Sequence, residues 1–326
     1  MYKAIRVLKY GGPDVMKVCE LPKLIPKNGQ IRLKIATAGV NPVDTYMREG
    51  WHSASKPCPY TPGLDCAGIV AEVGEGVKQF QVGDRVCSVG SVTGTYAEEG
   101  LFTEDQLYHI PSNITMREAA AIGTSYFTAY FAYLRLNPQP GEWVFIHGGT
   151  GGVGTALIQI CYHHKCKVVT STSNPDNVDK LLKLGANQVV FHNEEGYMDK
   201  VKTITKSGPT HIFEMLANKN LSSDLKILGK GGKVAIIGNR GEVTMNPRDL
   251  MVADGQIYGI MLFNANPETK ARMAGDVFHL LSNDILKPIV GHVYSLEDAP
   301  LAHEDVIQHK GGAWGRIILE MDKANN

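Results

Sequence analysis

The segment Trp143-Val144-Phe145-Ile146-His147-Gly148-Gly149-Thr150-Gly151-Gly152-Val153-Gly154 carries the strongest structural signal in this chain. Residues 143–147 are an apolar run that predicts a short buried strand, and residues 149–154 fit the pattern G-x-G-x-x-G. With 35 glycines in the chain the pattern alone has little weight, but here it follows a strand and leads into a predicted helix, 155–164. Glycine permits a tight turn and a close approach of diphosphate to the backbone, and a helix N-terminus favours an anion. The context therefore predicts a dinucleotide-binding loop rather than a purely structural turn.

Apolar strands alternate with helices on the C-terminal side of this loop. The predicted strands are 143–147, 167–172, 188–191, 211–214, 233–237 and 257–262, and the predicted helices are 155–164, 177–184, 197–205 and 221–228. Alternation at this spacing is typical of a doubly wound parallel sheet. We therefore predict an α/β protein with a Rossmann domain, a six-stranded parallel sheet over residues 125–265.

The residues outside this region predict a second domain. Short strands at 2–8, 30–36, 68–73 and 84–89 are separated by glycine and proline turns, which suggests a β-barrel or sandwich. A helix is predicted from 116 to about 134. The tail has a predicted helix, 268–281, and strands near 289–294 and 316–320, none of which continues the alternation. We predict one domain over 1–124, the Rossmann domain over 125–265, and a segment 266–326 that returns to the first domain.

The composition bears on two questions, which are whether the chain binds nucleic acid and in which cellular compartment it works. Lys plus Arg equals Asp plus Glu, 33 against 33, with no long basic run, which disfavours nucleic-acid binding as the main function. The six cysteines are scattered without a C-x-x-C pair, a distribution that suits reduced thiols. No apolar stretch approaches the roughly 18 residues of a membrane span, and the start of the chain has no apolar leader. The chain is expected to be soluble and cytoplasmic.

The end of the second Rossmann strand indicates which dinucleotide binds. Sites for NAD usually place Asp or Glu there to hold the ribose hydroxyls. This chain has Thr170-Ser171-Thr172-Ser173-Asn174 instead, and Asp176 lies further on as a predicted helix-cap acid. A carboxylate would repel a 2′-phosphate, whereas hydroxyls can donate hydrogen bonds to it. The sequence therefore favours NADPH.

Several longer strings are specific enough to suggest a family. They are Gly39-Val40-Asn41-Pro42-Val43-Asp44-Thr45-Tyr46, Pro59-Tyr60-Thr61-Pro62-Gly63, Tyr126-Phe127-Thr128-Ala129-Tyr130, Glu214-Met215-Leu216-Ala217-Asn218, Gly238-Asn239-Arg240-Gly241 and Asn246-Pro247-Arg248-Asp249. Over essentially its whole length the chain resembles the zinc-independent, zeta-crystallin-like quinone oxidoreductases of the medium-chain dehydrogenase/reductase superfamily. The resemblance implies a GroES-like β-barrel domain, an NADPH site in the cleft beside the Rossmann domain, a quinone substrate, and a homodimer or homotetramer.

The resemblance also implies site residues. Asn41 and Tyr46 are expected to lie in one polar loop. Both match residues beside the nicotinamide and are the predicted catalytic residues. The predicted cofactor-binding residues are Tyr46, Thr128, Gly149, Thr150, Gly151, Gly152, Val153, Ser173, His192, Asn220, Ile237, Gly238, Asn239, Arg240, Ile260, Met261 and Leu262. Ser173 stands where glycine is common, which could alter the 2′-phosphate pocket. Tyr46 could instead only pack between domains, and His192 could be a capping or surface histidine.

No metal site is predicted. Zinc-dependent relatives carry Gly-His-Glu where this chain has Gly63-Leu64-Asp65, and Leu64 cannot ligate a metal. They also begin with a ligand cysteine where this chain has Gly39-Val40-Asn41. Without a metal, an alcohol cannot be polarised by a Lewis acid.

We therefore predict transfer of reducing equivalents from NADPH to a quinone, with Tyr46 or Asn41 donating a hydrogen bond to the quinone oxygen. One alternative is an NADPH-dependent enone or enoyl-thioester reductase on the same scaffold. Another is a nucleotide-binding, crystallin-like structural protein. RNA binding rests on the resemblance alone and has no motif here. The apolar strand predicted at 257–262 is a candidate for edge pairing in a homo-oligomer.

Overall fold

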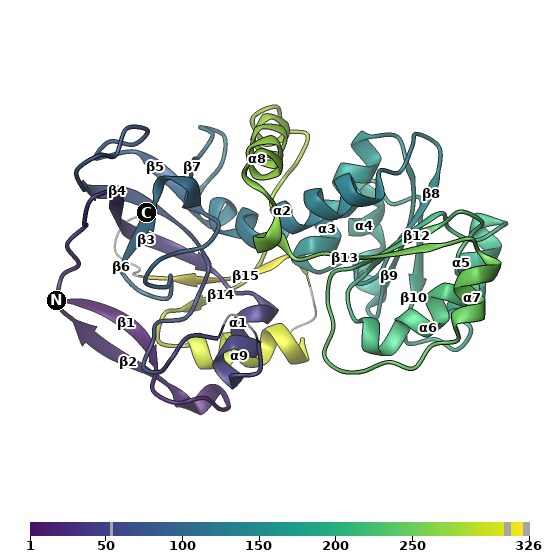
Figure 1. Ribbon diagram of the computed structural model, residues 1–326, viewed down its shortest axis with the longest axis horizontal. Helices are drawn as coiled ribbons and strands as arrows, with labels where there is room; N and C mark the ends of the chain where they lie inside the picture. Colours follow the sequence, from purple (N-terminus) through teal and green to yellow (C-terminus); the bar gives the residue numbers. More distant parts are fainter. Residues whose placement is uncertain (53–54, 310–313, 322–326) are drawn as a thin grey trace. The chain divides into compact units, whose positions relative to one another are not determined.

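The computed structural model of the chain describes residues 1–52, 55–309 and 314–321. The chain divides into two compact units. Unit 1 comprises Met1–Thr124 and Pro288–Asn326, and unit 2 comprises Ser125–Lys287. Figure 1 labels their elements. The chain re-enters unit 1 at Pro288, so helix α8 (Pro267–Ser282) belongs to unit 2, whereas the sequence grouped it with the segment that returns to the first domain.

Unit 1 is built mainly from antiparallel strands. Its elements are β1 (Tyr2–Val7), β2 (Met16–Leu21), β3 (Gln30–Gly39), α1 (Pro42–Glu49), β4 (Asp65–Val73), β5 (Arg85–Ser88), β6 (Glu99–Thr103), β7 (Leu107–His109), β14 (Val290–Ser295), α9 (Ala299–Gln308) and β15 (Arg316–Glu320), with single 3-10 turns at Pro13–Val15 and Glu104–Gln106. Seven strands form one sheet in the order β14-β15-β3-β4-β5-β7, with β6 paired to β3, and β1 pairs with β2. Among the described strands, the hydrogen-bonded order runs from β14 to β7, and these two end strands do not pair with each other. The long strand β3 contacts three neighbours, and its alternate residues Ile31, Leu33 and Ile35 are buried in the core.

The segment that follows β3 corrects one prediction. Residues 42–49, expected as a polar loop, form helix α1, which lies beside α9 in Figure 1. Asn41 is extended at the N-cap, and its backbone N–H donates to the Asp44 carboxylate at 2.9 Å. Pro42 fits the first helical turn, and Gly50 ends the helix in the left-handed conformation with φ 83°. The helix is short, and it is set by its caps rather than by a long apolar period.

Unit 2 has the predicted doubly wound sheet. Its strands are β8 (Trp143–Ile146), β9 (Lys167–Thr172), β10 (Gln188–Phe191), β11 (His211–Glu214), β12 (Lys233–Ile236) and β13 (Gln256–Gly259). Its helices besides α8 are the second half of α2 (Met116–Leu136), α3 (Gly152–His163), α4 (Val178–Leu184), α5 (Tyr197–Thr205), α6 (Ala217–Ile227) and α7 (Pro247–Val252), with 3-10 turns at Pro175–Asn177 and Leu262–Asn264. The strands are all parallel in the order β10-β9-β8-β11-β12-β13. In sequence order this is 3-2-1-4-5-6, which confirms the Rossmann fold.

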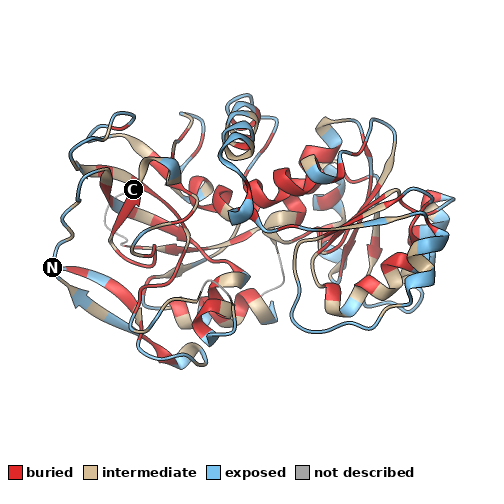
Figure 2. Ribbon diagram, in the orientation of Figure 1, coloured by how far each residue is buried: buried red, intermediate tan, exposed pale blue. Residues whose placement is uncertain are grey.

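The helices of unit 2 cover both faces of the sheet. Helices α3 and α4 lie on one face, and α5, α6 and α7 lie on the other (Figure 1). The central strands between them are buried, whereas the outer helix faces are exposed (Figure 2). In β8, Val144, Phe145 and Ile146 are fully buried, as a central parallel strand requires. The strand order reverses between β8 and β11, and at such a switch point α/β proteins bind ligands.

Helix α2 contains a break that the sequence analysis did not predict. Gly123 has non-helical angles, φ 5° and ψ −127°, and separates two helical stretches at the boundary of the units. A side chain at Gly123 would overlap the Asp65 carboxylate, so the position needs glycine. The break directs the backbone N–H of Thr124 to that same carboxylate, at 2.9 Å.

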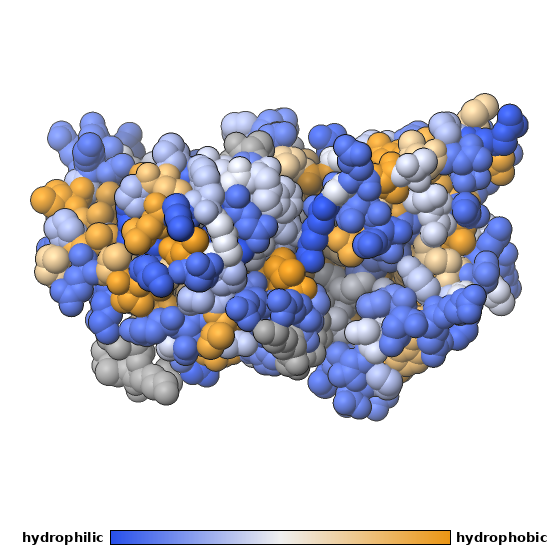
Figure 3. All heavy atoms as spheres, turned by 90° about the horizontal axis from the view of Figure 1, so that it is seen from below, coloured by the Kyte–Doolittle hydropathy of each residue, from blue (hydrophilic) through white to orange (hydrophobic). Residues whose placement is uncertain are grey.

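The exposed surface is mixed. In the view of Figure 3, hydrophobic and hydrophilic residues are interspersed over the visible face. Within the described ranges, no helix combines the length and the apolar character that crossing a bilayer requires.

Candidate functional site

The glycine-rich loop joins β8 to α3, as predicted. Two of its glycines are required by the protein's own packing. A side chain at Gly149 would overlap Thr170 on β9, and one at Gly154 would overlap the backbone carbonyl of Gly148. These close approaches bring the loop, the second strand and the start of α3 together.

Gly151 is different, because no described residue requires glycine there. It has φ −75°, which any residue adopts, and a Cβ would meet only the Gly148 carbonyl oxygen at 3.6 Å, an ordinary contact. Gly151 is also the N-cap of α3, beside the backbone N–H groups that the first helical turn leaves without intrahelical partners. Open space over backbone donors at a helix N-terminus fits a diphosphate. The loop therefore fits a dinucleotide on the evidence of its own geometry.

The hydroxyls at the end of β9 have separate tasks. Ser171 is buried, and its Oγ accepts a hydrogen bond from the Gly148 N–H at 3.1 Å while its carbonyl accepts from the Gly149 N–H at 2.9 Å. Thr172 is buried as well, whereas Ser173 is exposed. Ser171 therefore holds the start of the glycine-rich loop in place through hydrogen bonds. Ser173 carries the hydroxyl that solvent and a ligand can reach.

Other predicted cofactor residues gather at the ends of β11 and β12. The Glu214 carbonyl accepts hydrogen bonds from the N–H groups of Ile237, at 2.8 Å, and Gly238, at 3.2 Å. The Asn220 side chain donates to the Glu214 carboxyl at 3.1 Å. Since the carboxyl ends of parallel strands meet at one edge, these residues share the edge of the sheet that carries the glycine loop.

The remaining predicted residues flank this edge. Asn239 and Arg240 continue from Gly238, and the Arg240 N–H donates to the Asn218 side chain at 3.0 Å. Residues 260–262 follow β13, where the Ile260 N–H donates to the Ile236 carbonyl at 2.9 Å. His192 follows β10, with an exposed side chain, and its N–H donates to the Thr172 carbonyl at 3.1 Å. Thr128 follows no strand; it lies in α2, where it is buried. The cofactor roles of all these residues stay predictions.

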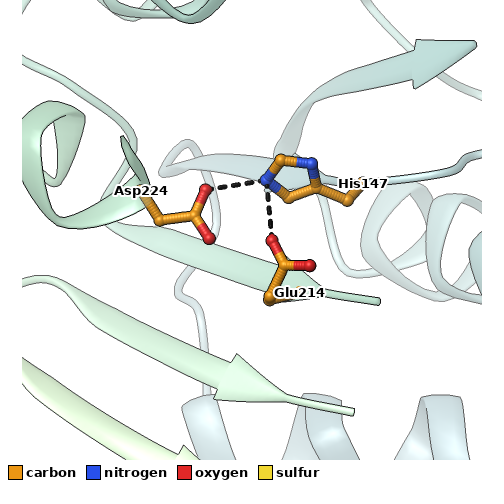
Figure 4. Close-up of side chains that lie close together, drawn as sticks. All are labelled: His147, Glu214 and Asp224. Atoms are coloured by element: carbon orange, nitrogen blue, oxygen red, sulfur yellow. Dashed lines mark hydrogen bonds and ion pairs between the residues drawn. The ribbon is translucent and has the colours of Figure 1, made fainter. Parts of the chain in front are cut away.

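A buried polar cluster that the sequence analysis missed lies at the switch point (Figure 4). His147 follows β8, Glu214 ends β11 and Asp224 lies in α6. The His147 Nε2 atom is 2.7 Å from Asp224 Oδ1 and 3.1 Å from Glu214 Oε2. All three side chains are buried. The sequence held one signal for this cluster. His147 and Glu214 each stand at the end of an apolar strand, and those strands, β8 and β11, are neighbours in the sheet.

Burial sets the protonation of this cluster. Desolvation raises the pKa of Glu214 to about 8 and that of Asp224 to about 7, and it lowers the pKa of His147. At neutral pH the imidazole is therefore uncharged and the Glu214 carboxyl holds a proton. Among the described residues, this is the one group of three His, Cys, Asp or Glu side chains whose ligand atoms lie within 4.8 Å of one another.

In unit 1, Asn41 belongs to a buried ion-pair network. Its Nδ2 donates to Asp65 Oδ2 at 2.9 Å, and its Oδ1 accepts from Arg316 Nη1 at 2.6 Å. Arg316 Nη2 donates to Asp65 Oδ2 at 2.8 Å, and Thr124 donates to Asp65 Oδ1 from its N–H and its hydroxyl. One amide hydrogen and one lone pair of Asn41 are left by these bonds, so the side chain is held in place rather than free to turn.

This network does not fit a zinc ion. The positions at which zinc-dependent relatives carry ligands hold Leu64, which has no donor atom, and Asp65, whose two oxygens accept four hydrogen bonds. The Arg316 guanidinium already supplies the positive charge beside the carboxylate. A metal ion bound to Asp65 would therefore have to displace the Arg316 guanidinium.

Tyr46 lies on the outer side of α1. Its neighbours Asp44, Thr45, Met47 and Arg48 are buried, whereas Tyr46 is half-buried. Its ring packs against Trp51 with centroids 4.5 Å apart and planes 31° apart. This tilted ring contact restricts the Tyr46 ring, and the half-buried position is compatible with contact to a ligand.

Comparisons with known proteins cover nearly the whole chain. Residues 27–112 match the family model described as alcohol dehydrogenase GroES-like domain, and residues 152–277 match the one described as zinc-binding dehydrogenase. Quinone oxidoreductase from Sus scrofa is 44% identical and the one from Homo sapiens 39%, each over 322 residues and 98% of both chains. The crystal structure of Escherichia coli quinone oxidoreductase complexed with NADPH has a TM-score of 0.89 at 27% identity, over 98% of this chain and 100% of that one. A Pseudomonas syringae quinone oxidoreductase has a TM-score of 0.89 at 26% identity, with the same coverage.

Proposed function

Because this chain belongs to the quinone oxidoreductase family, we propose that it transfers reducing equivalents from NADPH to a quinone. The structural observation that carries the proposal is the open space at Gly151 beside a helix N-terminus. The end of β9, which has hydroxyls and no acid, supports NADPH over NADH. An NADPH complex of a solved relative supports the same choice.

The chain's own residues would bind and orient the reactants. The reduced nicotinamide supplies the hydride when NADPH is bound. The loop 149–153 would hold the diphosphate through backbone N–H groups, and Ser173 would donate to the 2′-phosphate. Tyr46 would donate a hydrogen bond to the quinone oxygen as that oxygen gains negative charge. Asn41, fixed by Asp65 and Arg316, would support this contact with its remaining N–H.

A turnover panel tests the proposal. We expect quinones to be reduced with NADPH, with rates that strong chelators leave unchanged because Leu64 and Asp65 do not fit zinc. The panel should include enones, an enoyl-thioester and alcohols, each with NADPH and with NADH. Faster turnover of the enone or enoyl-thioester would favour the reductase alternative. Tight NADPH binding that raises the melting temperature, without turnover of any acceptor, would favour a structural role.

Ser173→Asp is expected to erode the preference for NADPH. Ser173 is the exposed hydroxyl at the end of β9, so a carboxylate there changes the charge facing the ligand without disturbing the core. We expect kcat/KM with NADPH to fall severalfold, with a smaller loss for NADH, and the effect to weaken as salt rises. Ser171→Asp is unsuited to the test, because Ser171 is buried beneath the loop. Equal losses for both cofactors in Ser173→Asp would contradict a 2′-phosphate contact at this position.

We also propose that the chain forms a homodimer or homotetramer through β13. This strand is an edge of the parallel sheet, and its middle residues Ile257 and Tyr258 are only half-buried. The nearby helix α7 exposes Met251 and Val252, which are 71% and 78% accessible. Light scattering at micromolar concentration that gives the monomer mass would overturn this proposal.

The compartment we propose is the cytoplasm. All six cysteines are free thiols, which supports a reducing environment. Recovery of the protein in a membrane or secreted fraction of its host would contradict it.

A further inference from the structure

The buried cluster of His147, Glu214 and Asp224 has more acceptor atoms than donors. Glu214 Oε2 and Asp224 Oδ2 are buried and have no hydrogen-bond donor among the described residues. The recorded ion-pair partner of both carboxyls is the His147 imidazole, which has one Nε2 hydrogen to share between them. Two ionised carboxylates in this place would be costly, because burial penalises each charge and each raises the energy of the other.

We propose that Glu214 and Asp224 share one proton, held between Glu214 Oε2 and Asp224 Oδ2, and that this proton-linked pair with His147 is a positioning unit for the bound dinucleotide. The shared proton gives both orphan oxygens a partner. It also leaves the cluster with one negative charge instead of two. The inference rests on the proposed function, because it assigns the unit a role toward NADPH.

The cluster is connected to three segments that the dinucleotide site uses. His147 directly precedes Gly148 of the glycine loop. The other oxygen of Glu214, Oε1, accepts from the Leu216 N–H and from the Asn220 side chain. The Glu214 carbonyl holds the N–H groups of Ile237 and Gly238. A displacement of Glu214 would therefore move Asn220 and the turn after β12 together.

Loss of the shared proton should have two effects on cofactor binding. The two carboxylates would repel each other, and Glu214 would be displaced from the geometry that holds Asn220. A second negative charge would also lie beneath the loop that we propose holds the diphosphate. Both effects weaken NADPH binding, so the affinity should fall as pH rises through the pKa of Glu214, about 8.

The groups that face the cluster come from each element packed around it. Besides His147 on the β8 side, Glu214 on β11 and Asp224 on α6, they include Tyr197 on α5, whose pKa burial and the two carboxyls raise to about 12. They also include His192 after β10, an exposed residue whose pKa is lowered by desolvation on its inner side and by His147. Tyr197 stays protonated and His192 stays neutral throughout alkaline titration up to about pH 9. Among the groups that face the cluster, the carboxyl pair is therefore the one that titrates in this range.

The test uses Glu214→Gln, whose amide donates to Asp224 at every pH as the protonated carboxyl does. NADPH affinity of the unaltered protein should fall by about tenfold between about pH 7 and pH 9, because about one tenth of the molecules keep the proton one pH unit above the pKa. The phosphate of NADPH itself titrates near pH 6 and contributes little here. Glu214→Gln should lose little NADPH affinity between about pH 7 and about pH 9, so the readout is the ratio of its affinities at the two pH values and not the affinity at either one. Glu268→Gln, which alters an exposed carboxyl of α8 in the same unit, should keep the full pH dependence.

Two measurements need no cofactor. In infrared spectra of the free protein at neutral pH, the carbonyl stretching band of buried protonated carboxyls should lose intensity in Glu214→Gln, and the intensity that remains is expected from Asp44, whose pKa burial raises to about 7. The free energy of unfolding should also depend on pH through Glu214. A folded-state pKa above the unfolded value means that the native state binds more protons, so this contribution to stability falls as pH rises from about 4.5 to about 8. That decline should be smaller in Glu214→Gln.

The outcomes separate the inference from the function. Tight NADPH binding that is flat with pH in the unaltered protein, or equally pH-dependent in Glu214→Gln, overturns the inference and leaves the function standing. No NADPH binding at any pH overturns the function first. One equivalent of a divalent metal per chain, lost in both Glu214→Gln and Asp224→Asn, overturns the shared proton, because the ion would then be what the carboxyls hold. Asp224→Asn also serves if Glu214→Gln does not fold, and it should show the same loss of pH dependence.

Discussion

Arg316→Met is expected to lower the free energy of unfolding by about 3–5 kcal/mol. The guanidinium lies in the interior of unit 1, 2.8 Å from Asp65 Oδ2 and 2.6 Å from Asn41 Oδ1. The Asp65 carboxylate is fully buried, and without Arg316 it keeps only neutral donors from Asn41 and Thr124. A buried charge that loses its counterion keeps the full cost of desolvation, which explains the size of the effect.

Urea unfolding monitored by circular dichroism measures this loss. The matched control is Arg117→Met, which removes a 2.7 Å ion pair with Glu320 whose arginine is 46% exposed, so that about 0–1 kcal/mol is expected. The double variant Arg316→Met with Asp65→Asn removes both charges, and part of the stability should return. Equal effects for Arg316→Met and Arg117→Met would show that the Asp65–Arg316 pair is not desolvated as the geometry implies.

The local pattern of unit 2 was sufficient to predict its architecture. Strand β9, strand β10, strand β11 and helix α5 begin and end at the predicted residues. A buried parallel strand needs a continuous apolar run, and the helices between such strands need an apolar face, so the alternation is visible within short windows. The glycine loop was equally local, because strand, loop and helix are consecutive in the chain.

The parts that the sequence did not reveal depend on contacts between distant residues. Arg316 and Asp65 are 251 positions apart, and His147 and Asp224 are 77 apart. No window of the sequence contains both members of either pair. The prediction of a loop at Tyr46 was wrong for another reason. Helix α1 is specified by its caps at Asn41 and Gly50, and with only 8 residues it is too short to show a clear helical repeat of apolar residues.

Tyr46→Phe is expected to lower kcat/KM for quinones by about 10–100-fold, which corresponds to a lost hydrogen bond worth about 1–3 kcal/mol. We propose that the Tyr46 hydroxyl donates to the quinone oxygen, and phenylalanine lacks this donor but keeps the ring that packs on Trp51. NADPH affinity should therefore change little. Steady-state kinetics with a simple quinone, together with NADPH titration, measure the two effects separately.

The control for Tyr46→Phe is Tyr10→Phe, which removes a hydroxyl that donates to the Lys56 carbonyl at 2.9 Å on the surface of the same unit. It should leave turnover unchanged. We propose that His192, which follows β10, contacts the adenosine end of NADPH. His192→Ala should therefore show the opposite pattern, with altered NADPH affinity and nearly normal turnover at saturation. If Tyr46 only packs, Tyr46→Phe should lower thermal stability and leave the rate of the folded enzyme alone. If His192→Ala loses hydride transfer while Tyr46→Phe turns over normally, the proposed catalytic role of Tyr46 is wrong. A residue that contacts only the adenosine end of NADPH should have no direct effect on the reacting atoms.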